Sequence, residues 1–131
     1  MGILEKIAKF WKPEGNQNTK VMEPGKAAFL LTFKDLTIGT LWTENSIWYF
    51  EYTDAYKNSP SCSALIDFPN KQRIYQSEAL WPFFVHRIPG LKQPAVQEIL
   101  RLEHIDPRDE VKLLRRFGQY NISNPYILQP A

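Results

Sequence analysis

The stretch AAFLLTFKDLTIGTLWTENSIWYFEY, residues 27–52, decides the fold. It contains three segments rich in aromatic and β-branched residues, at 27–33, 36–43 and 46–52. Such segments favour strands, and the polar pairs Lys34-Asp35 and Glu44-Asn45 that join them favour two-residue hairpin turns. The stretch therefore predicts a three-stranded antiparallel meander, in which Gly39 marks a bulge or a close approach.

The segments after the meander predict one more strand and then helices. A fourth strand is expected at 62–67. Residues 94–103 place Val96, Ile99 and Leu100 on one helical face, and a second helix is expected from Asp106 as N-cap to Gly118. Residues 121–131 predict an irregular apolar tail. The fold class is α+β: a small, strongly twisted antiparallel sheet, open or partly closed, followed by two or three packed helices.

Composition limits the chain to one main domain and excludes several partner classes. The 131 residues are 44% hydrophobic, which is enough for one core, and the net charge of +2 is too small to favour direct binding of nucleic acid. The single cysteine, Cys62, excludes an intramolecular disulfide, and no apolar run is long enough to cross a membrane. We expect a cytoplasmic protein.

The N-terminal residues predict a separate element. Residues 1–12 show helical spacing of apolar side chains, with charged residues between them; the apolar members are Ile3, Leu4, Ile7, Phe10 and Trp11. A linker rich in Pro, Gly and Asn follows, so the expected division is an amphipathic helix plus flexible linker at 1–24 and a folded domain at 25–131. The helix is short for membrane attachment, and docking on a partner is the preferred role.

Signs of catalysis are missing from the sequence. The six glycines are too far apart to form a phosphate-binding loop. The pair His86-Arg87 is followed by Ile88 and lacks the metal ligand of a kinase catalytic loop, while His104 has no partner ligands nearby. We therefore expect no catalytic, cofactor-binding or metal-binding residues, and a protein that is not an enzyme.

Three large aromatic side chains surround a proline in LWPFF, residues 80–84. Pro82 fits the first turn of a helix, so a short helix at 82–87 is expected with Trp81 at its entrance. Phe83 and Phe84 then fix this helix to the sheet. Trp81 is equally compatible with core packing and with a protein interface, where exposed tryptophans often dominate binding.

The order and spacing of several segments resemble the N-terminal domain of HipA-type serine/threonine kinases. These segments are Phe29-Leu30-Leu31-Thr32-Phe33, Ile38-Gly39-Thr40-Leu41, Trp48-Tyr49-Phe50-Glu51-Tyr52, Phe68-Pro69, Tyr75-x-Ser77 and Pro82-Phe83-Phe84-x-x-x-Ile88-Pro89. The resemblance covers residues 26–118. Gly90 follows Pro89 directly where the family pattern has Glu, and the first 20 residues have no counterpart.

In that family a longer kinase core follows this domain, and the sequence to Ala131 contains no counterpart of it. The chain therefore resembles the HipS-like small subunit of split HipA toxin-antitoxin systems. The resemblance implies an antitoxin that binds and restrains a HipT-like kinase, with a HipB-like DNA-binding protein as a further partner. A passive subunit that completes a split kinase, or an unrelated adaptor, stays open as an alternative. The expected partner-binding residues are Leu80, Trp81, His86 and Arg87.

Overall fold

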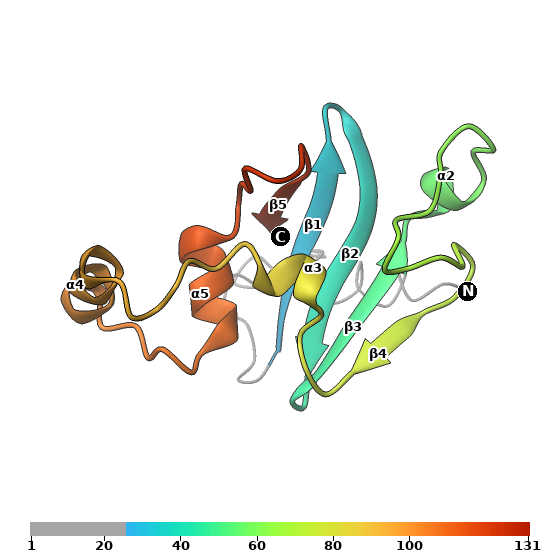
Figure 1. Cartoon of the computed structure of the whole chain (residues 1–131). Coiled ribbons are helices and arrows are strands. Elements are labelled where there is room, and N and C mark those ends of the chain that lie inside the picture. Colours follow the sequence, from blue (N-terminus) through green and yellow to red (C-terminus); the bar gives the residue numbers. More distant parts are fainter. Residues whose placement is uncertain (1–25) are drawn as a thin grey trace, which may run out of the picture.

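The computed structural model describes residues 26–131, so the predicted N-terminal helix and linker lie outside the described residues. An open five-stranded antiparallel sheet in the order β4-β3-β2-β1-β5 forms the centre (Figure 1). Its strands are β1 (Lys26–Phe33), β2 (Leu36–Glu44), β3 (Ile47–Tyr52), β4 (Tyr75–Ser77) and β5 (Ile127–Pro130). The helices of the described part are α2 (Asp54–Lys57), α3 (Pro82–Val85), α4 (Pro94–Glu103) and α5 (Glu110–Phe117). The α+β prediction is confirmed, and the sheet is not closed.

Two tight turns set the register of the meander. Lys34 and Asp35 connect β1 to β2 as predicted, with Lys34 at a φ of 57°. The second turn is Asn45–Ser46 rather than Glu44-Asn45, because both of its residues have positive φ, 54° and 67°. Two left-handed residues form a type I′ turn, whose twist matches that of the strands it joins. The predicted second turn was therefore displaced by one residue.

Gly39 lies where two strands and an aromatic ring meet. A Cβ atom at this position would stand 2.5 Å from Cζ of Phe50 and 2.9 Å from the carbonyl oxygen of Glu51. The register of β1 also shifts between Leu31 and Thr32, next to the pairing of Leu31 with Gly39. The predicted close approach at Gly39 is confirmed.

The fourth strand predicted at 62–67 is wrong, and the fourth strand of the sheet is β4. Side chains bind the backbone of this segment in place of a neighbouring strand. The Tyr52 hydroxyl accepts from the Leu65 amide at 2.8 Å and donates to the Phe68 carbonyl at 2.6 Å. The Lys71 ammonium donates to three carbonyl oxygens, those of Tyr56, Ser59 and Cys62. Residues 59–68 therefore form a loop in which side chains, in place of a neighbouring strand, bind several backbone groups.

The two longer helices match the predicted segments except at one end. α4 has the predicted bounds, and Val96 and Leu100 are buried. α5 begins at Glu110 with Asp109 as its N-cap, so the prediction of Asp106 was wrong. The Asp106 carboxylate instead accepts from the Arg108 amide at 2.8 Å and closes a turn through Pro107. α5 ends at Gly118 as predicted.

The tail predicted to be irregular contains β5. This strand pairs with β1, with Leu128 opposite Leu31 and Pro130 opposite Phe29. Leu128 is buried, which gives the apolar tail a place in the core. The C-terminal residues therefore complete one edge of the sheet.

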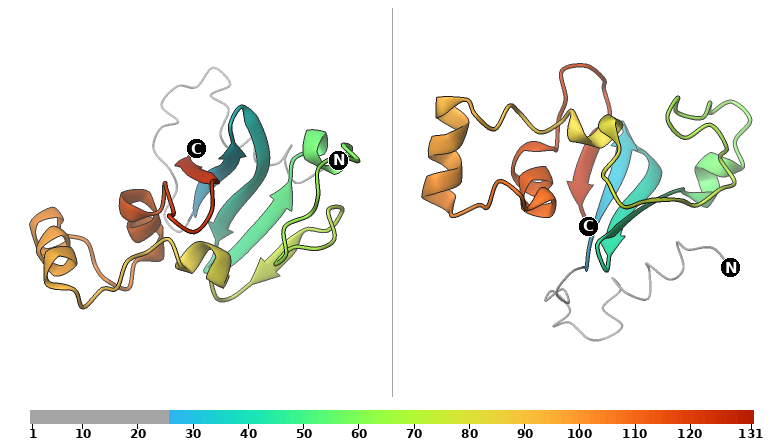
Figure 2. Two further views of the ribbon diagram at one scale, coloured as in Figure 1. Left: turned by 45° about the horizontal axis from the view of Figure 1, so that its top comes forward. Right: turned by 60° about the horizontal axis from the view of Figure 1, so that its bottom comes forward.

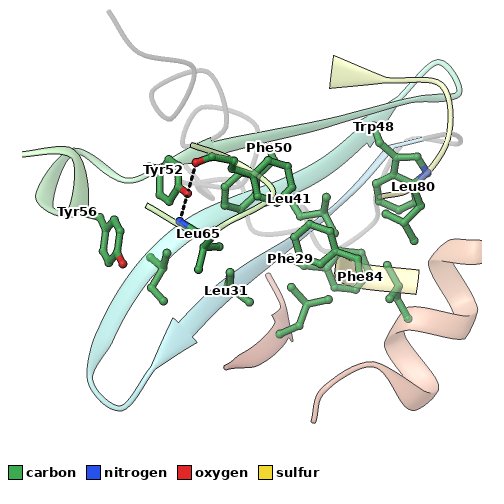
Figure 3. Packing of buried hydrophobic residues seen from close by; sticks show 14 residues of the cluster. Phe29, Leu31, Leu41, Trp48, Phe50, Tyr52, Tyr56, Leu65, Leu80 and Phe84 are labelled. Atoms are coloured by element: carbon green, nitrogen blue, oxygen red, sulfur yellow. Dashed lines mark hydrogen bonds between the residues drawn. The ribbon is translucent and has the colours of Figure 1, made fainter. Parts of the chain in front are cut away.

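The main core lies between the sheet and α3, α5 and the loop 59–68; we call this side of the sheet the inner face. Alternate residues of the central strands point into it (Figure 3): Phe29, Leu31, Leu41, Trp48, Phe50 and Tyr52. α3, α4 and α5 do not cover the opposite, outer face (Figure 2), whereas Lys57 of α2 reaches its end and pairs with Glu51 at 2.8 Å. On that outer face a separate small cluster is formed by Ala28, Trp42 and Tyr49.

Candidate functional site: the surface around α3

Trp81 lies at the entrance of α3, as the position of Pro82 predicted. Its backbone is extended, with φ −67° and ψ 147°, and Pro82 occupies the first turn. The Trp81 carbonyl accepts from the amides of Phe84 and Val85, both at 2.9 Å. This one-turn helix therefore fixes the direction in which the Trp81 side chain leaves the backbone.

Aromatic packing holds the Trp81 ring and covers part of it. The ring meets Phe68 edge to face with centroids 5.2 Å apart, and it contacts Phe84 at 6.5 Å. Phe68 and Phe84 are fully buried, whereas Trp81 is half-buried. Edge-to-face contacts restrict an aromatic ring to few orientations. Trp81 therefore presents a pre-oriented, partly exposed indole at the surface.

Phe83 also packs on Phe68, with ring centroids 6.3 Å apart. Phe83 contacts Phe84 at 5.0 Å and Tyr126 at 6.0 Å, and it is half-buried. It thereby links α3 to the segment that leads into β5.

Two of the four predicted partner-binding residues are buried inside the domain. Leu80 is 5% exposed and belongs to the main core. Arg87 is 4% exposed, and its guanidinium donates to four oxygens of the C-terminal segment: Gly118 O, Gln119 O, Asn124 Oδ1 and Tyr126 O. Burial lowers the pKa of Arg87 to about 10, so the side chain stays charged at neutral pH. Arg87 connects α3 to the tail in the free chain.

His86 lies at the C-terminal end of α3 and is exposed. Of the predicted residues, the structure thus brings Trp81 and His86 to the surface and places Leu80 and Arg87 beneath it. These positions show which side chains a partner could reach in the free chain; the predicted contacts themselves stay predictions.

Sequence reasoning missed an apolar groove beside α3. This groove of about 440 Å³ lies between the loop 59–68, Phe83 and Tyr126, and Leu65 and Ile66 are among its lining residues. Ile66 is 94% exposed, although it is large and apolar. The sequence clue, the apolar Ile66, was overlooked because residues 62–67 were interpreted as a strand. In a strand, Ile66 would have belonged to a packed face.

A second, wider groove of about 580 Å³ runs beside α5. Trp48 lines it and donates from Nε1 to Oε1 of Glu110 at 3.1 Å. Its other charged residues have both signs: Glu78, Arg108, Asp109, Lys112 and Arg115. A mixture of this kind does not select a partner of one charge, so α3 carries the stronger candidate surface.

The metal-ligating side chains of residues 26–131 do not cluster. Within this part of the chain no three His, Cys, Asp or Glu side chains lie close enough together to hold a metal ion. His104 closes the end of α4 with a φ of 56°. A search of the same residues finds no helix with the length and apolarity of a membrane span.

The comparisons with known proteins agree with the fold. The N-terminal domain of HipA toxin is a structural neighbour with a TM-score of 0.53 and 16% sequence identity, over 80% of this chain and 92% of the neighbour. No curated protein sequence matches the chain. The family model of the HipA N-terminal domain matches residues 30–122, which include α3 and the loop 59–68 but not Tyr126. The chain therefore belongs to the HipA N-terminal domain family.

Proposed function

We propose that the chain is a non-catalytic antitoxin subunit that binds a HipT-like serine/threonine kinase and restrains it. The observation that carries the proposal is the half-buried Trp81 ring, held on Phe68 and Phe84 at the start of α3. Pre-oriented aromatic side chains lose little conformational entropy on binding and often supply most of the binding energy of an interface. Trp81 would enter a cleft of the kinase and hinder nucleotide binding, substrate binding or closure of the two lobes.

The residues around Trp81 support this role. The exposed His86 lies at the other end of the same short helix, and the apolar groove with Ile66 lies beside Phe83. An exposed apolar side chain, an apolar groove and polar residues at the margin are typical of protein interfaces. The family relation makes a component of a HipA system the natural context, and a HipB-like protein would be a third member of the complex.

The alternative is a passive subunit that completes a split HipA-type kinase, or an adaptor without inhibitory effect. The same surface would serve such a subunit, because binding alone does not decide whether the kinase is restrained. The two roles predict opposite effects on kinase activity.

Co-expression distinguishes them. A HipT-like kinase is induced in bacteria alone, with this chain, and with its Trp81→Ala variant, and both growth and soluble kinase are measured. An antitoxin restores growth at an unchanged level of soluble kinase, and Trp81→Ala restores it less. Unchanged toxicity, or higher kinase activity and solubility with the chain present, would reject the antitoxin role.

A further inference from the structure

The outer face of the sheet carries apolar residues that the described helices do not cover. Register places them together: Ala28 pairs with Trp42, and Trp42 pairs with Tyr49. The Trp42 and Tyr49 rings stack with centroids 5.1 Å apart and planes 13° apart. Leu30 points to the same side, because Phe29 and Leu31 point to the inner face. We call Ala28, Leu30, Trp42 and Tyr49 the outer patch.

A solvated sheet face ordinarily alternates with the core face and carries polar side chains. The outer face of β1, β2 and β3 departs from this rule in part: the outer patch is apolar, whereas the paired residues Thr40 and Glu51 on the same face are polar and also buried. α3 and α5 pack on the inner face, and α2 and α4 lie beside the sheet (Figures 1 and 2). Ala28 and Trp42 are only 1% and 7% exposed, and Leu30 and Tyr49 are half-buried, although α3, α4 and α5 do not pack on them. An apolar layer of this kind is completed by a covering element.

The N-terminal segment of the chain can supply this covering element. The 25 residues before Lys26 lie outside the described part, and they lead directly into β1, two residues before Ala28. Residues 1–12 have an apolar side formed by Ile3, Leu4, Ile7, Phe10 and Trp11. The family match begins at residue 30, so residues 1–12 lie outside the matched part of the chain. We propose that residues 1–12 form a helix that packs its apolar side on the outer patch.

The dimensions fit this assignment. A helix of 12 residues is about 18 Å long. The three central strands span about 10 Å from the first axis to the third, so one helix can cover the patch. A flexible linker of 13 residues reaches about 20 Å on average. The linker from Pro13 to Gly25 is thus long enough to return the helix over β1 without strain.

Residue size at the patch favours a helix as the occupant. Ala28 is small and pairs with the large Trp42, so side chains such as Ile7 would pack over Ala28 beside the Trp42 ring. The charged residues of the segment, Glu5, Lys6, Lys9 and Lys12, then face solvent. Docking of this kind turns the two-layer domain into three layers and leaves the surface around α3 as the accessible one.

Two full-chain variants test the assignment by stability. Ile7→Gln places a glutamine at the centre of the apolar side of the helix. The control, Lys9→Gln, places a glutamine on its charged side. Ile7→Gln is expected to lower the midpoint of thermal unfolding by about 3 to 6 °C, and Lys9→Gln by less than about 1 °C. Equal midpoints for the two variants and the unmodified chain would overturn the proposal.

A spin label locates the helix independently of stability. With Cys62→Ser as background, Glu5→Cys carries a nitroxide on the charged side of the helix. The amide signals of Ala28, Trp42 and Tyr49 are expected to broaden, and those of α4 to stay sharp. Adding Ile7→Gln should restore the broadened signals.

The other occupants give different results, and each would overturn the proposal. If a second copy covers the patch, labelled chains will broaden the signals of unlabelled, isotope-enriched chains in a mixture. If residues 1–12 dock only on another protein, the outer patch will stay sharp in the free labelled chain. Broadening around α3 would place the helix on the inner side instead.

Discussion

Replacing Arg87 by Met should strongly destabilise the domain, because this buried guanidinium holds the C-terminal segment. Its donors lie 2.8 Å from the carbonyl oxygens of both Gly118 and Tyr126, with further bonds to Gln119 and Asn124. Hydrogen bonds from a charged group contribute about 1.5 to 3 kcal/mol each, and buried acceptors left without donors cost about 1 to 3 kcal/mol.

The sum of four such bonds overstates the loss of stability. Burying the Arg87 charge costs free energy, and this cost disappears when Met replaces it. We expect a loss of about 3 to 5 kcal/mol in the free energy of unfolding, a large share of the 5 to 15 kcal/mol of an ordinary domain. With a urea m value of about 2 kcal/mol/M, the midpoint falls by about 1.5 to 2.5 M.

Urea unfolding followed by circular dichroism measures the loss, and hydrogen exchange locates it. The amide of Leu128, which donates to the Gln119 carbonyl at 3.0 Å, should exchange much faster in the variant. The control is Arg116→Met: the ion pair of Arg116 with Glu103 is exposed, and its loss should cost less than about 1 kcal/mol. A shift of Arg87→Met no larger than that of the control would refute the role given to Arg87.

Three further predictions concern stability. Gly39→Ala should cost about 1 to 3 kcal/mol in thermal unfolding, because its Cβ would overlap the Phe50 ring; an unchanged midpoint would show that the ring can move away. His104→Gly should raise the free energy of unfolding by up to about 1 kcal/mol, because His104 is held at a left-handed φ of 56°; a lower stability would mean that the imidazole makes compensating contacts. Burial raises the pKa of Tyr52, so the folded state keeps a proton that the unfolded state loses above pH 10, and stability should be complete below that pH and fall as pH rises beyond it. Tyr52→Phe should remove this part of the pH dependence, and an identical alkaline profile in the variant would assign the loss to other groups.

The sequence predicted those elements whose stabilising contacts are local. The hairpins follow from alternating apolar residues and two-residue turns, and the start of α3 follows from Pro82, which is restricted to the first turn. β5 was missed because its partner is 97 residues away, with Leu128 opposite Leu31. The sequence of residues 121–131 alone does not indicate that pairing.

Two other predictions, the strand at 62–67 and the partner contact of Arg87, did not account for side-chain contacts between residues that are distant in sequence. Residues 62–67 have strand-like composition, but the Tyr52 hydroxyl binds both Leu65 and Phe68 and holds them in a loop. Arg87 was predicted to bind a partner, which would place it at the surface, whereas its guanidinium is buried and donates to carbonyl oxygens of the C-terminal segment. In both places the outcome depends on acceptors or donors that are distant in sequence.

Calorimetric titration of a HipT-like kinase with Trp81→Ala tests the central claim most directly. We expect affinity to fall by about tenfold to a hundredfold relative to the unmodified chain, which corresponds to about 1.4 to 2.8 kcal/mol. Because Trp81 is half-buried on Phe68, its loss should cost the free domain only about 1 to 2 kcal/mol, so the variant stays folded during the titration. Kinase affinity equal to that of the unmodified chain would show that Trp81 serves only the core and would contradict the account.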